Sequence, residues 1–155
     1  MSTASANLED NELSCVLIPA PGVQLLLPNV SVAEIMPWRR IKELPDGPQW
    51  CMGHVAWRGQ EVPVVHYASF ADETSPTPTT ARCLVVMNRA RSVGGAPFYA
   101  LAADGLPRIL QLIDDDLHSL DAKLGAADVM HVRVGTEAAV IPDLAFIERA
   151  VAELS

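Results

Sequence analysis

Cysteine is scarce in this sequence, and its three copies are not arranged for cross-linking. Cys15, Cys51 and Cys83 are an odd number, and no two of them form a CxxC pair. Disulfide frameworks use even numbers of cysteines and structural zinc sites use closely spaced ones, so this pattern is typical of reduced thiols. We therefore expect a cytoplasmic protein with no disulfide framework and no zinc site.

Basic residues are also few. The chain has 11 Lys and Arg against 19 Asp and Glu, which leaves a net charge of −8. Its one dense basic patch, Arg39, Arg40 and Lys42, is followed at once by Glu43 and Asp46. So acidic a chain repels phosphate backbones and anionic lipids, which makes nucleic acid and membrane surfaces poor partners. Another protein is the more plausible partner.

Long apolar runs are missing. The longest stretch, 15–28, is interrupted by Pro19, Pro21 and Gly22, whereas a membrane-spanning helix needs about 20 apolar residues. The N-terminus has neither a basic start nor an apolar centre, so it does not read as a signal peptide. Because 50% of the residues are hydrophobic and only 19% are charged, we expect a loose tail over 1–12 and one folded domain over 13–155.

Catalytic signatures are missing as well. The sequence contains no GxSxG, GxGxxG or HExxH motif, and the three aspartates at 114–116 lack the Gly and Glu spacing of a calcium loop. A hairpin could bring Cys51, His54 and His66 together. A small metal- or thiol-dependent enzyme using these three residues is therefore an alternative, but the main expectation is a protein with no catalytic residue, cofactor or metal.

Short apolar segments separated by turn residues dominate the chain. Such segments predict an all-β fold, with small barrels or a sandwich as the architecture. The predicted hairpins are 14–19 with 23–28, 53–57 with 60–67, and 129–134 with 138–141, and further strands are predicted at 82–87 and 98–103, with a turn at Gly94-Gly95. Residues 106–112 fit a strand or a short helix, and 114–128 reads as a polar connection.

Three further features refine this architecture. A Pro/Thr-rich linker at about 72–81 divides the chain into halves with a similar order of elements, which suggests two related barrels. Pro63 cannot donate to a ladder, so its strand is expected at a sheet edge or beside a bulge. Asp143 is well placed to cap a final helix, because Leu144 and Ile147 begin an apolar face at helical spacing.

The turn of the second hairpin carries Trp57, Arg58 and Gly59. Trp and Arg dominate the hot spots of protein interfaces. A Trp packed inside a barrel and an Arg in a solvated turn would give the same pattern, so the residue types alone leave both readings open.

The same hairpin resembles the signature of the CheW-like domain family, which runs roughly P-x-W/Y-x-x-G-x-(I/V)-N-L-R-G-x-(I/V)-(I/V)-P-V-(I/V)-D-L. Residues 48–65 read PQWCMGHVAWRGQEVPVV, and agreement continues in VAEI at 32–35, IKELP at 41–45 and AAD at 102–104. The resemblance implies two interlocked five-stranded SH3-like barrels with a C-terminal helix.

The resemblance also implies a function. The domain in this family is a non-enzymatic adaptor that couples chemoreceptors to a CheA-type histidine kinase, by binding the kinase's own CheW-like domain and the receptor tip. It implies Arg58-Gly59 near the partner-contacting junction and apolar positions beside the receptor-binding groove, with Trp57 enlarging that apolar surface. The partner-binding residues expected on this basis are Arg58, Gly59, Trp57, Val62, Val32 and Ile35.

Two positions depart from the family pattern. Ala56 stands where Asn is usual and His66 where Asp is usual, so the hydrogen bonds that brace the usual hairpin cannot form in the same way. These departures favour an accessory CheW-like protein of a type IV pilus and twitching-motility system over a flagellar coupling protein. A self-associating barrel protein with a structural role is a third alternative, and the sequence does not predict the oligomeric state.

Overall fold

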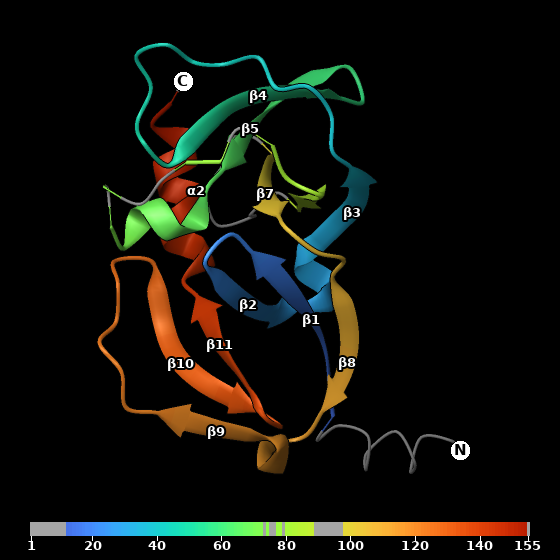
Figure 1. Ribbon diagram of the computed structural model, residues 1–155. Helices are drawn as coiled ribbons and strands as arrows, with labels where there is room; N and C mark the ends of the chain where they lie inside the picture. Colours follow the sequence, from blue (N-terminus) through green and yellow to red (C-terminus); the bar gives the residue numbers. More distant parts are fainter. Residues whose placement is uncertain (1–11, 73, 75–76, 79, 89–97, 155) are drawn as a thin grey trace.

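The computed structural model describes residues 12–72, 74, 77–78, 80–88 and 98–154 (Figure 1). Most of the predicted tail and the predicted Gly94-Gly95 turn lie outside these residues. Within them the fold is two β-sheets and one helix near the C-terminus, which confirms the all-β prediction.

The first sheet has six strands in the order β8-β1-β2-β11-β10-β9. Its strands are β1 (Leu13–Ala20), β2 (Val23–Pro28), β8 (Arg108–Leu112), β9 (Leu117–Leu120), β10 (Asp128–Val134) and β11 (Glu137–Pro142). β9 lies in the segment expected to be a polar connection. Its two central residues, His118 and Ser119, show no apolar alternation, so the sequence did not predict a strand there. This sheet therefore has one strand more than the five expected.

The second sheet has five strands in the order β3-β6-β7-β5-β4. Its strands are β3 (Val32–Pro37), β4 (Cys51–Trp57), β5 (Gln60–Val65), β6 (Cys83–Met87) and β7 (Tyr99–Ala103). Figure 1 shows this sheet in the upper half of the molecule and the six-stranded sheet below it. Single turns of 3-10 helix precede β3, follow β5 and precede β9: η1 (Asn29–Ser31), η2 (Tyr67–Phe70) and η3 (Asp114–Asp116).

The chain passes between the sheets twice, through η1 and through residues 104–107. The linker at 72–81, expected to divide two halves, instead joins two strands of the five-stranded sheet. The first sheet is therefore built from both ends of the chain and the second from its middle. The expectation of two separate halves was based on their similar order of elements, and the order along the chain does not say which strands pair.

Pro63 lies in β5, which pairs with β4 on one side and β7 on the other, so the edge-strand expectation is wrong. The pairing with β7 includes Val64 and Val65 but not Pro63, so the missing N–H interrupts no bond there. A bulge does occur beside it, but in the partner strand, between Cys51 and Gly53.

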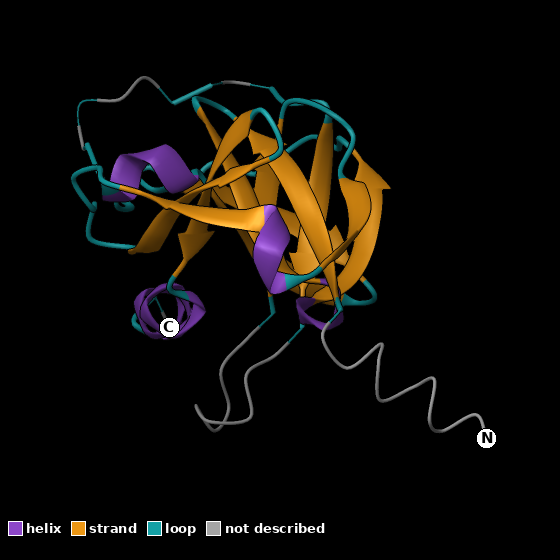
Figure 2. Cartoon of the chain, turned by 90° about the horizontal axis from the view of Figure 1, so that it is seen from below, coloured by secondary structure: helices purple, strands orange, loops and turns teal. Residues whose placement is uncertain are grey.

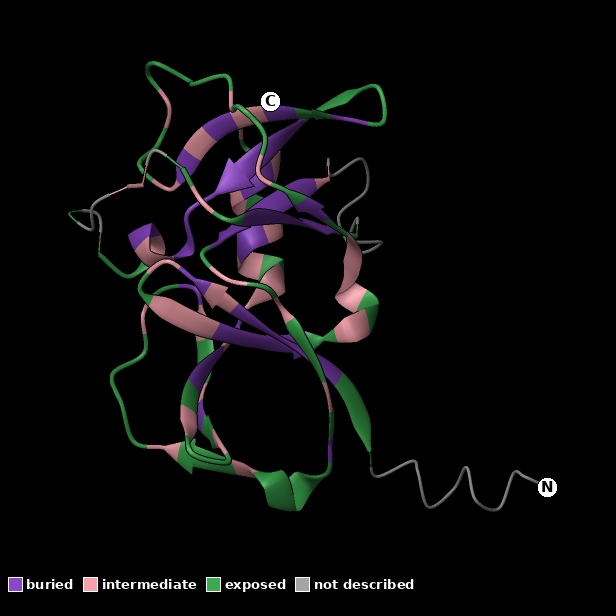
Figure 3. Cartoon of the chain, turned by 45° about the vertical axis from the view of Figure 1, so that its right-hand side comes forward, coloured by how far each residue is buried: buried purple, intermediate pink, exposed green. Residues whose placement is uncertain are grey.

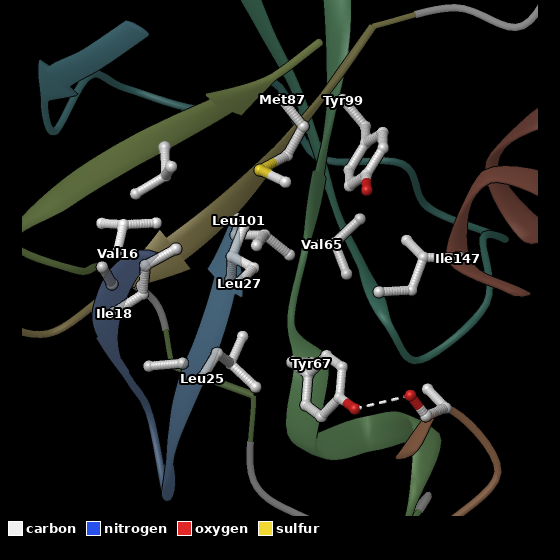
Figure 4. Close-up of a cluster of buried hydrophobic side chains, with 14 of the residues drawn as sticks. Val16, Ile18, Leu25, Leu27, Val65, Tyr67, Met87, Tyr99, Leu101 and Ile147 are labelled. Atoms are coloured by element: carbon white, nitrogen blue, oxygen red, sulfur yellow. Dashed lines mark hydrogen bonds between the residues drawn. The ribbon is translucent and has the colours of Figure 1, made fainter. Parts of the chain in front are cut away.

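The core between the two sheets is continuous. Val16 and Leu25 of the six-stranded sheet pack with Val65 and Leu101 of the five-stranded sheet (Figure 4), and Figure 3 shows buried residues concentrated at this level. Alternate residues of the same strands, such as Leu17, face a second core inside their own sheet. Burial on both faces explains why these strands read as continuous apolar runs in the sequence.

Helix α2 (Leu144–Ala152) lies at one edge of the molecule, outside the strands (Figure 2). The Asp143 side chain accepts a hydrogen bond from the backbone N–H of Phe146 at 3.1 Å, so the predicted cap is confirmed. Ile147 and Val151 are buried in the shared core, and the helix therefore helps to hold the sheets together.

Candidate functional site

The turn between β4 and β5 has a backbone conformation that few residues adopt. Trp57 pairs with Gln60, so the loop consists of Arg58 and Gly59 alone. Their φ angles are 47° and 76°. Positive φ at both central residues is the hairpin turn that matches strand twist, and it usually takes Asn or Gly. Arg58 is the only described non-glycine residue with positive φ, so the turn holds this side chain at some cost in backbone energy.

Glu34 of β3 holds the tip of this hairpin. Its Oε1 accepts hydrogen bonds from Nε1 of Trp57 and from Nη2 of Arg58, each at 3.1 Å. The guanidinium of Arg58 lies 4.7 Å from the centroid of the Trp57 ring. The Arg58–Glu34 ion pair is solvent-exposed, so it contributes at most about 1 kcal/mol. Its effect is to orient the Arg58 guanidinium at the surface.

Trp57 and Val62 are buried beneath this tip. Trp57 is 4% exposed and meets Phe98 edge to face, with ring centroids 4.9 Å apart. Val62 packs in the same core inside the five-stranded sheet. The expectation that Trp57 enlarges the apolar surface is therefore corrected: it supports the surface position of Arg58 from below, and only Arg58 and Gly59 of these four residues are exposed.

A second group of exposed residues lies where the chain passes between the sheets. On β3, Val32 is half-buried and Ile35 is 42% exposed. Sequence reasoning missed three larger exposures here: Val30 of η1 at 81%, Leu106 at 64% and Ile109 of β8 at 61%. Ile109 pairs with buried Val16 of β1, and nothing in the sequence distinguishes it from a core residue.

The two departures from the family pattern have local replacements. His66 is buried, and its Nδ1 lies 2.8 Å from Oγ of Ser69. Burial lowers the pKa of His66, partly offset by the charge of Asp104. The backbone carbonyl of Ala56 accepts a hydrogen bond from Nη1 of Arg39 at 2.9 Å. The hairpin is thus braced from the segment after β3 rather than by an Asn side chain.

The enzyme alternative gains no support from the positions of its residues. Burial raises the pKa of the Cys51 thiol, which disfavours the reactive thiolate. His66 faces Ser69, while His54 exchanges backbone bonds with Lys42. Among the described residues, no group of three or more His, Cys, Asp or Glu side chains could hold a metal ion. In the same residues no helix has the length and apolar character to span a membrane.

Comparisons with known proteins bear on the family and the fold. A family model described as CheW-like domain matches residues 14–147. Among solved structures, the fold is similar to that of the scaffolding protein TtCheW from Thermoanaerobacter tengcongensis, with a TM-score of 0.67 and 12% sequence identity over 85% of this chain and 84% of that chain. No curated protein sequence matches the chain. The structural likeness supports the fold of two SH3-like barrels.

Proposed function

The chain belongs to the CheW-like domain family, and on that premise we propose that it is a non-enzymatic adaptor of bacterial chemosensory signalling. The proposed partners are the CheW-like domain of a CheA-type histidine kinase and the tip of a chemoreceptor. The observation that carries the proposal is the exposed Arg58 at a tight turn, held by Glu34 and backed by buried Trp57. A guanidinium that is already oriented loses less side-chain entropy when a partner binds.

We assign the two proposed partners to different residues. We assign the kinase to the Arg58-Gly59 tip. We assign the receptor to the apolar residues at the crossings, which include half-buried Val32 and exposed Ile35 and extend to exposed Val30 and Ile109. Exposed apolar side chains are the ordinary means of protein recognition when they gather in one region.

We further propose that the system served is one that controls type IV pili and twitching motility. The support is the pair of departures at Ala56 and His66, because both alter the bracing of the kinase-facing hairpin. A bacterial two-hybrid assay against the kinases of the pilus and flagellar systems tests this proposal. Interaction with the flagellar kinase alone would contradict it.

Calorimetric titration of the purified chain with the kinase's CheW-like domain tests the adaptor proposal. Arg58→Ala is expected to weaken binding by about tenfold or more, since Arg is a common hot-spot residue. The matched control is Arg133→Ala, which removes an exposed arginine from β10 in the other sheet. No detectable binding, or equal binding by both variants, would contradict the proposed site.

A charge at Val62 is a poor test of binding. Val62 is buried, so a charged side chain there would unfold the sheet before it reported on an interface. For the receptor surface, Ile35→Glu and Ile109→Glu are better variants, because both side chains are exposed. They are expected to weaken binding to a receptor-tip peptide while leaving kinase binding unchanged.

A further inference from the structure

A groove lies beside β4, at the opposite end of the strand from the Arg58-Gly59 turn. It runs between the segment 38–43 on one side and Thr77, Pro78 and Thr80 on the other, with Met52 of β4 between them. Its volume is about 1060 Å³. Met52 and Trp57 are five residues apart on one strand, which is about 17 Å, and neither Arg58 nor Gly59 lines this groove, which we call the basic groove.

The walls of the basic groove are fixed by hydrogen bonds. Lys42 and His54 exchange two backbone bonds, each 2.8 Å long. The close approach depends on Gly53, where a Cβ would lie 2.3 Å from the Lys42 carbonyl oxygen. On the other wall, Nε2 of Gln49 donates to Oγ1 of Thr77 at 2.7 Å. The backbone bonds thus hold the wall at 41–42 against β4, and the Gln49–Thr77 bond links the opposite wall to the segment before β4.

The lining of the basic groove combines positive charge with apolar surface. Arg40 and Lys42 are exposed and line it, and neither forms an ion pair with a described residue. Among the described residues that line the groove, Glu43 is the one acidic side chain, so two cations face one carboxylate. This local excess of positive charge stands out in a chain whose net charge is −8.

Apolar side chains give the groove a second kind of contact. Trp38, Ile41 and Met52 are partly buried against the core of the five-stranded sheet and also line the groove. A ligand that matches both features has carboxylates for the cations and an apolar side chain for the half-buried Trp38. The hydroxyls of Thr77 and Thr80 add hydrogen-bonding groups on the opposite wall.

We propose that the basic groove binds an acidic peptide segment of a partner protein. The carboxylates of the segment pair with Arg40 and Lys42, and an apolar residue of the segment rests on Trp38 and Met52. A second copy of this chain is a worse occupant, because two copies of net charge −8 repel each other. This binding does not depend on the adaptor function proposed above.

Fluorescence anisotropy of a labelled decapeptide with alternating Glu and Leu residues tests the proposal on the full chain. Binding is expected, and it should weaken as salt is added, because the charges involved are exposed. The double variant Arg40→Glu/Lys42→Glu is expected to lose about tenfold or more in affinity. This double variant reverses two positive charges in the groove.

Three controls separate a groove from general charge attraction. A peptide with Gln in place of Glu should bind at least about tenfold more weakly. Arg133→Glu makes the same charge reversal on β10 and should leave peptide affinity unchanged. Arg58→Ala should also leave it unchanged, so a failure of the proposed kinase site would not be mistaken for a failure of this one.

Several outcomes would overturn the proposal. Equal binding of the Glu and Gln peptides would do so, and so would equal affinity of the double variant and of Arg133→Glu for the peptide. Absence of peptide binding, together with self-association that the double variant abolishes, would show that a second copy of the chain occupies the groove. Thermal unfolding of each variant shows that it is folded. The milder pair Arg40→Gln/Lys42→Gln repeats the test if the charge reversals destabilise the chain.

Discussion

Glu34 and Arg58 lie 24 residues apart in the sequence, yet Oε1 of Glu34 accepts a hydrogen bond from Nη2 of Arg58 at 3.1 Å. The same oxygen accepts the indole N–H of Trp57. One carboxylate oxygen from β3 therefore fixes both the exposed cation and the buried ring at the tip of the β4–β5 hairpin. The cation is oriented by a strand that is not part of the hairpin.

Replacing Arg58 separates its backbone role from its side-chain role. Arg58→Asn is expected to keep the free energy of unfolding within about 0.5 kcal/mol of the original, because Asn tolerates positive φ. Arg58→Val should lower it by about 1–3 kcal/mol, because a β-branched residue is strained at this φ. Urea unfolding measures both. Equal stability of the two variants would show that the turn has another conformation in solution.

Glycine is required at position 53 by space as well as by φ. A Cβ on Gly53 would meet the backbone of Lys42, at a φ of 137°. Gly53→Ala is therefore expected to cost about 2 kcal/mol or more and to open the wall formed by 41–42. Gly59→Ala is the matched control, since its φ is 76° but no atom lies within 4 Å of the added Cβ. Its cost should be smaller, and the reverse order in thermal unfolding would contradict the close approach.

Two buried tyrosines give a test of the contact between η2 and β10. The Tyr67 hydroxyl lies 2.7 Å from both the Ala127 carbonyl oxygen and Oδ1 of Asp128. Tyr67→Phe is expected to lower the free energy of unfolding by about 1–3 kcal/mol, because buried acceptors lose their donor.

Tyr99→Phe is the control for that experiment. The Tyr99 hydroxyl is buried with no hydrogen-bond partner among the described residues, so its removal is expected to be neutral or stabilising. Chemical denaturation of the two variants side by side measures the difference. A larger loss for Tyr99→Phe than for Tyr67→Phe would contradict the two environments.

His66 predicts a pH dependence of stability. Burial lowers its pKa in the folded chain below the ordinary value of 6.5, so the unfolded chain binds more protons in the window between the two values. The contribution of His66 to stability is therefore fully present above pH 6.5 and is lost as the pH falls through the lower, folded pKa.

Urea unfolding from about pH 8 to about pH 5 checks this prediction. His66→Gln should flatten the fall in unfolding free energy on the acid side. His118→Gln, which removes an exposed histidine from β9, is the control for the substitution itself. A slope that is the same in all three proteins would show that His66 does not titrate differently on folding.

Much of the local structure was predictable from neighbouring residues. Apolar segments of four to eight residues, bounded by Gly and Pro, predicted most of the strands, and Asp143 predicted the helix cap. The hairpin motif at 48–65 predicted the family, because a tight turn places strict demands on a few adjacent positions. These features depend on interactions between residues close in sequence.

The sequence by itself therefore determined most of the strands, the Arg58-Gly59 turn and the family, whereas the tertiary structure decided which side chains reach the surface. Trp57 is buried although the resemblance implied that it enlarges a binding surface, and Ile109 is exposed although it looks like a core residue in the sequence, because exposure depends on which face of a strand is covered. Glu34 reaches Arg58 only because the five-stranded sheet curls until its two opposite edge strands, β3 and β4, approach each other. Contacts of this kind join segments whose pairing no local pattern specifies.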